Sequence, residues 1–193
     1  ADLTLTLATA GGLLAREDGD WTATVTGVAP TLLLGSGVVI SGVSVAATPT
    51  PLGGWAVTVS GSSSATPLTS TELSGILTME QAGDPALGCL EGDATGASHG
   101  LDFAGSTLQF CRGANGVVTP SLSGSLLLEG TALNYTGSLT LSSPWAMSLL
   151  LPYQPLAPGI TLVDVTLSLG EDTNDIGLQS TLILGDGPTL AEL

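Results

Sequence analysis

The 193-residue chain carries 17 acidic residues, two arginines and no lysine, which gives a formal net charge of −15. Binding to DNA, RNA or anionic lipid depends on Lys and Arg, so this charge argues against nucleic acid and anionic membranes as partners. Apolar residues make up 43% of the chain and aromatic residues only 4%, so we expect a sizeable core built mainly from Leu, Val and Ala.

Apolar and hydroxyl residues alternate along most of the chain, as in β-strands with one buried and one wet face. In chain order the clearest runs are 3–7, 21–26, 55–59, 73–79, 126–128, 139–141, 145–151, 163–169 and 182–184. Gly, Pro, Asn and Asp separate these runs, and no window has a convincing helical period. The sequence predicts one all-β domain over residues 1–193, a module of a longer protein. We expect about 10–11 antiparallel strands and minimal helix, arranged as a β-sandwich or as a strongly curled β-barrel or meander.

Three glycines fall in phase with the Leu faces of their strands. They are Gly75, Gly124 and Gly137, each within a similar pattern of Ser or Thr, Gly and Leu. A missing side chain on a packed face lets the sheet curl or another backbone approach closely. These positions predict a strongly bent sheet.

Four prolines, Pro144, Pro152, Pro155 and Pro158, flank or interrupt the strand-like run 145–151. Since proline cannot donate a hydrogen bond to a neighbouring strand, we expect this strand at a sheet edge, where the region 143–160 would dock a neighbouring module. A long crossover loop is the alternative.

Cys89 and Cys111 are the only cysteines, 22 residues apart around a Gly-rich segment. They lack the spacing of a zinc or redox site, so we expect a structural disulfide rather than two buried thiols. A disulfide implies an oxidising compartment, and with the Ser/Thr-rich surface it indicates an exported protein, extracellular or at the cell surface.

Catalytic and metal-binding residues are sparse. The single histidine, His99, lies in Ser98–Asp102, where sequence adjacency does not make a catalytic triad, so we expect no enzyme activity. We predict no resident cofactor, and calcium is the only metal worth considering. Its candidate ligands are Asp172, Asn174 and Asp175, which offer closely spaced oxygens in an acidic turn. A solvated hairpin tip is the alternative for this turn.

The resulting hypothesis is a non-catalytic exported or cell-surface domain with a structural, adhesive or assembly role. Its partner would be another protein or a further copy of the chain, joined through sheet edges that no lysine protects. The alternative is a carrier or sensor of an apolar ligand such as a lipid, held in a Leu-lined β trough. A hydrolase is the third and weakest hypothesis.

Overall fold

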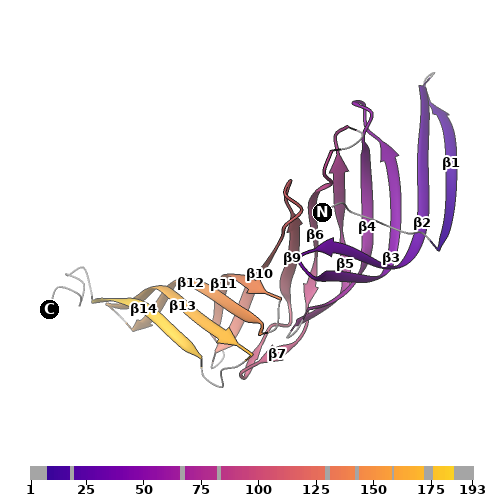
Figure 1. The fold of residues 1–193 in the computed structure, drawn as a ribbon. Coiled ribbons are helices and arrows are strands. Elements are labelled where there is room, and N and C mark those ends of the chain that lie inside the picture. Colours follow the sequence, from indigo (N-terminus) through magenta and orange to yellow (C-terminus); the bar gives the residue numbers. More distant parts are fainter. Residues whose placement is uncertain are drawn as a thin grey trace.

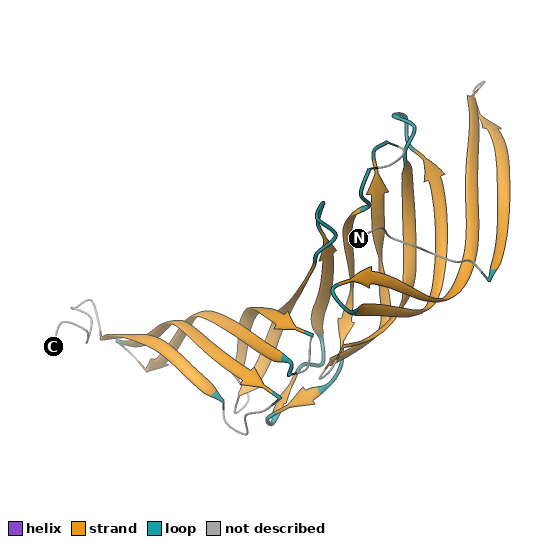
Figure 2. Ribbon diagram, viewed as in Figure 1, coloured by secondary structure: helices purple, strands orange, loops and turns teal. Residues whose placement is uncertain are grey.

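The computed structural model describes residues 8–17, 20–65, 68–81, 84–128, 131–141, 144–157, 159–171 and 176–184. These residues form fourteen strands and no helix (Figure 2), which confirms the all-β prediction. The described part accordingly contains no helix that could cross a membrane.

Twelve strands form one antiparallel sheet in the order β1-β2-β3-β4-β5-β6-β9-β10-β11-β12-β13-β14, and β7 pairs only with β8. The prediction of about 10–11 strands was low partly because β7 and β8, of two residues each, are too short to show alternation. The strands are β1 Thr9–Glu17, β2 Asp20–Gly35, β3 Val38–Pro49, β4 Trp55–Ala65, β5 Leu68–Met79, β6 Leu87–Ala94, β7 Ala97–Ser98, β8 Leu101–Asp102, β9 Ser106–Arg112, β10 Val118–Leu128, β11 Thr131–Thr140, β12 Ala146–Ala157, β13 Ile160–Gly170 and β14 Gly177–Leu184.

The sheet is a bent meander with two wings (Figure 1). Strands β1 to β5 form the N-terminal wing, strands β11 to β14 form the C-terminal wing, and β6, β9 and β10 join them. Within the described residues β1 and β14 each pair on one side only, so the sheet is open and is not closed into a barrel.

The N-terminal wing rolls over the middle of the sheet. Register shifts between Leu33 and Gly35, Ser41 and Ser44, and Gly61 and Ser63 lie in neighbouring strands. Such irregularities increase local twist and bend a sheet. The tip of the β2–β3 hairpin thereby reaches the region of β6 and β9 (Figure 1).

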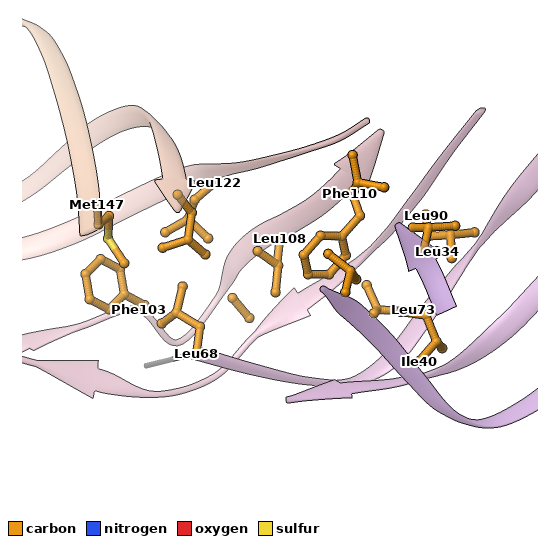
Figure 3. Close-up of a cluster of buried hydrophobic side chains, with 14 of the residues drawn as sticks. Leu34, Ile40, Leu68, Leu73, Leu90, Phe103, Leu108, Phe110, Leu122 and Met147 are labelled. Carbon is orange, nitrogen blue, oxygen red and sulfur yellow. The ribbon is translucent and has the colours of Figure 1, made fainter. Parts of the chain in front are cut away.

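The apolar core has two centres on the inner, concave face of the bent sheet (Figure 3). One surrounds Phe110, and its neighbours come from the N-terminal wing and β6: Leu34, Ile40, Leu73 and Leu90. The other surrounds Phe103, with Leu68, Leu122 and Met147. Leu108 lies between the two centres, so the core is continuous across the join of the wings (Figure 3).

Arg112 and Ser36 fasten the β2–β3 tip onto the middle of the sheet. Arg112 is buried, and its Nε donates a hydrogen bond of 3.0 Å to the Leu34 carbonyl while its Nη1 donates one of 2.7 Å to the Ala86 carbonyl. The backbone N–H of Val118 donates to Ser36 Oγ at 3.0 Å. These bonds join β2, β9 and β10, and we call this group the clasp.

Gly35 lets the clasp close. A Cβ at this position would lie 2.6 Å from the Gly116 carbonyl oxygen, and its φ of +131° is rare for residues with side chains. The sequence prediction for the in-phase glycines is also confirmed, because a Cβ at Gly124 would lie 2.8 Å from Ser106 Cβ and one at Gly137 would lie 2.6 Å from Leu149 Cδ2. At Gly75 a Cβ would overlap the Cys89 carbonyl.

The excursion between β6 and β9 covers the second core centre. The segment 95–105 first pairs with β5 through a Thr95–Thr69 bridge, then leaves the main sheet to form the β7–β8 hairpin. It returns through a turn in which Ser106 N–H donates to the Phe103 carbonyl. Phe103 is fully buried, and its ring packs edge-to-face against Tyr135 with a centroid distance of 6.2 Å. One aromatic side chain thus anchors the excursion onto β11.

The expectation that the proline-rich strand forms a sheet edge was wrong. This strand, β12, lies inside the sheet, between β11 and β13. However, β11 pairs only with Ala146–Leu150, whereas β13 pairs along the strand to Ala157. Pro152 and Pro155 therefore lie in the part of β12 that is not paired with β11, although β11 continues to Thr131, and the register shifts beside Pro155. The local rule for proline holds, although the strand is not an edge.

Candidate functional site

The two open ends of the sheet are the candidate functional site, because its buried inner face becomes exposed there. On the N-terminal wing, directly paired residues form a row from β9 to β1. In order they are Phe110, Leu90, Gly75, Val59, Val45, Gly27 and Ala10. Leu90 is 0% exposed and Val45 is 7% exposed, whereas Ala10 on the edge strand is exposed. We call these residues the N-terminal row.

A matching row crosses the C-terminal wing from β9 to β14. Its members are Leu108, Leu122, Gly137, Leu149, Leu167 and Leu178. Leu149 is 0% exposed, Leu167 is half-buried, and Leu178 is 63% exposed. In this C-terminal row, the last leucine has neighbours on β13 but no strand beyond β14 among the described residues.

The edge strands lack the usual protection against pairing. Natural sheets shield edges with lysine, proline or inward-pointing charges. Among the described residues, strand β14, Gly177–Leu184, has neither charge nor proline, and β1 has charges, Arg16 and Glu17, only at one end.

The disulfide prediction is confirmed, since Cys89 and Cys111 are bonded to each other. They are direct partners in the β6–β9 pairing, and both are partly exposed on the outer face, opposite the core. The bond joins the two strands that flank the excursion 95–105, at the junction of the wings.

The predicted calcium turn, with Asp172, Asn174 and Asp175, lies outside the described residues. Its immediate neighbour Glu171 is described, and its Oε2 accepts a hydrogen bond of 3.0 Å from the Trp145 backbone N–H. Elsewhere in the described part of the chain no three His, Cys, Asp or Glu side chains gather as a metal site would require.

His99 has a structural setting. It lies in the β7–β8 turn with a φ of +52°, its Nδ1 is 2.8 Å from Ser98 Oγ, and its ring packs edge-on against Trp145. The Asp102 carboxylate accepts a hydrogen bond from the Ala104 N–H. The ring contact of His99 thus joins the excursion to Trp145, the residue directly before β12.

A small polar group is buried inside the second core centre. The Tyr135 hydroxyl donates to Ser106 Oγ at 2.6 Å, and both residues are buried. Burial raises the pKa of the Tyr135 phenol, and the hydrogen bond with Ser106 opposes this in part. Ser70 is also buried, and its Oγ has no hydrogen-bond partner among the described residues.

The described surface includes a larger and a smaller hollow. The larger, of about 440 Å³, is lined mainly by serines and glycines of the bent strands β3 to β5, with Glu72 as its only charged residue. The smaller, of about 290 Å³, lies between the β2–β3 turn and the ends of β10 and β11. Its lining combines Val118, Pro120, Leu139 and Leu141 with the hydroxyl residues Ser36, Thr119 and Thr140.

Comparison with known proteins assigns no family. No family model matches the sequence, and neither a curated protein nor a solved structure matches it at a significant level.

The sequence predicted unprotected sheet edges in general, but it did not identify Ala10 and Leu178 as exposed residues of the two edge strands. A run of eight uncharged residues, Gly177–Leu184, was a signal for β14. It did not reveal that this strand is the last in the sheet, because strand order depends on pairing between distant segments.

Proposed function

We propose that this chain is a non-catalytic, exported structural domain that assembles with other protein through the open ends of its sheet. One observation carries the proposal: along the C-terminal row, exposure rises from 0% at Leu149 to 63% at Leu178. A strand added beyond β14 would gain main-chain hydrogen bonds and cover this leucine. Covering it would stabilise the assembly by about 1–2 kcal/mol.

The chemistry of the chain supports this role. The edges lack lysine and proline, and the Cys89–Cys111 disulfide is typical of proteins in oxidising compartments. The polar side chains of Ser98 and His99 are hydrogen-bonded to each other within a turn, and those of Tyr135 and Ser106 are hydrogen-bonded between two strands. Both pairs support the structure of the domain.

Sedimentation velocity of the purified chain tests the proposal, with a dilution series from micromolar to millimolar at low and high salt. Association that increases with concentration, without loss of the β-sheet circular dichroism signal, is the expected result. A sedimentation coefficient that remains that of one chain under every condition would contradict an assembly role through self-association.

The smaller hollow favours a second candidate function, carriage of a small apolar ligand. Its volume of about 290 Å³ is at the lower end of the range for ligand pockets, and its lining contains no charged residue. Such a site would take a neutral, apolar molecule. Native mass spectrometry followed by organic extraction should then find a stoichiometric ligand, and an empty extract from protein purified without detergent would exclude it.

A further inference from the structure

We propose that the partner at the open ends is a second copy of this chain, with the β14 edge of one copy pairing with the β1 edge of the next. This inference rests on the proposed assembly function and specifies its geometry. A contact between two different edges is heterologous, so repeated addition produces an open fibre unless the rotation closes a ring.

The two edges are complementary in length and in side-chain size. Strand β1 has nine residues and β14 has eight. At the start of β1 the inner-face residues Ala10 and Gly12 are small and exposed, whereas at the start of β14 the inner-face residue Leu178 is bulky and exposed. Leu178 of one copy can therefore fill the space over Ala10 of the next, and the apolar inner face continues across the junction.

Charge favours the β14–β1 pairing over pairing of two identical β14 edges. Two exposed acidic residues, Asp164 and Glu171, lie on or directly after β13, the neighbour of β14. Of the two arginines in the chain, Arg112 is buried in the clasp and Arg16 lies on β1. A β14–β14 contact would bring two acidic flanks together, whereas β1 carries no net charge because Arg16 is offset by Glu17, so a β14–β1 contact contains only one such flank.

The net charge predicts how self-association should depend on salt concentration. Two copies of net charge −15 repel each other at long range, and this repulsion is screened as ionic strength rises. Self-assembly should therefore strengthen with sodium chloride, by at least about tenfold in dissociation constant between 50 and 500 mM. A basic protein partner would show the opposite dependence, because salt weakens attraction between unlike charges.

The decisive test uses two single variants, each with an inward-pointing lysine at one edge. Ala10→Lys blocks β1 and Leu178→Lys blocks β14; both sites are exposed, so both variants should fold. The matched controls Thr9→Lys and Gln179→Lys add the same charge on the outer face of the same strands. All are studied as full chains by sedimentation velocity at high salt.

Each inner-lysine variant alone should remain monomeric, because every β14–β1 contact then contains one blocked edge. An equimolar mixture should form a one-to-one dimer that grows no further, from the free β1 edge of the Leu178→Lys copy and the free β14 edge of the Ala10→Lys copy. Both control variants should assemble like the unmodified chain.

Other outcomes would overturn the inference in distinguishable ways. Dimers of Ala10→Lys alone would indicate β14–β14 pairing, and dimers of Leu178→Lys alone would indicate β1–β1 pairing. Undiminished assembly of both variants would place the contact on another surface and would contradict assembly through the open ends. An unmodified chain that never associates would overturn pairing between copies and leave a different protein as the partner of the open ends.

Discussion

The middle of the sheet and its two ends have the same alternating pattern but differ in what covers their apolar face. Leu149 and Leu178 belong to one row of paired residues, yet the first is fully buried and the second is 63% exposed. In the middle, the rolled β2–β3 tip and the excursion carrying Phe103 cover the inner face. Alternation thus specifies which face is apolar, while contacts between distant segments decide whether that face is buried.

The largest expected effect is the difference in stability loss between truncating the buried Leu149 and truncating the exposed Leu178. Leu149→Ala should lower the free energy of unfolding by about 3 kcal/mol, because it leaves a cavity in a packed core. Leu178→Ala should change it by less than about 0.5 kcal/mol, because that side chain is mainly in water. Urea unfolding of dilute protein measures both values. Equal losses would mean that the exposed leucine is already covered in the monomer.

The disulfide sharpens the same comparison, because it fixes the junction of the wings. Replacing both Cys89 and Cys111 with alanine should lower the free energy of unfolding by about 3 kcal/mol. The reason is that the two positions, 22 residues apart in the sequence, are then no longer held together in the unfolded chain. The double variant should still place Phe103 in the core, which near-ultraviolet circular dichroism can check. A free energy of unfolding equal to that of the disulfide-bonded chain would show that the disulfide does not stabilise the protein.

Breaking the clasp should have an intermediate effect confined to the N-terminal wing. Arg112→Met removes the donors to the Leu34 and Ala86 carbonyls, and we expect a loss of about 2 kcal/mol in urea unfolding. Arg112→Lys, which keeps one charged donor, is the control and should lose less. If the methionine variant proved as stable as the parent, hydrophobic packing alone would hold the β2–β3 tip in place.

The smallest expected effect is a pH dependence from Tyr135. Burial raises its pKa above the ordinary value near 10, so the unfolded chain releases the phenolic proton at lower pH than the folded chain. The corresponding stability is fully present below about pH 10 and is lost as the pH rises through the folded-state pKa.

Tyr135→Phe should therefore flatten the loss of stability above about pH 10, at a cost of about 1 kcal/mol at neutral pH from the lost bond to Ser106. Denaturant midpoints across this range measure the effect. An unchanged alkaline slope would assign it to other groups.

Much of the fold was predictable because each strand has its own local signal. The Leu and Thr alternation identified the strands, the two isolated cysteines predicted their bond, and glycines in phase with the apolar face predicted close approaches in a bent sheet. Arg112 and Phe103 could not be placed in this way. A charged residue normally predicts exposure, and the buried Arg112 donates hydrogen bonds to the carbonyls of Leu34 and Ala86, 78 and 26 residues away in the sequence.

The candidate site was predictable in kind but not in position. The absence of lysine indicated unprotected edges, but proline content suggested β12 as an edge when the edges are β1 and β14. A proline only requires that no neighbouring carbonyl needs its missing N–H donor, and this condition is met in the half of β12 that is not paired with β11.

Amide hydrogen exchange, measured on dilute chain and on concentrated chain at high salt, tests most directly whether the ends of the sheet are its assembly surfaces. We expect amides of β1 and β14 to exchange fast in the dilute state and to become protected on assembly, while those of β9 and β10 stay protected in both. Equal protection of β14 and β9 in the dilute state, or assembly without new protection at β1 and β14, would contradict the account.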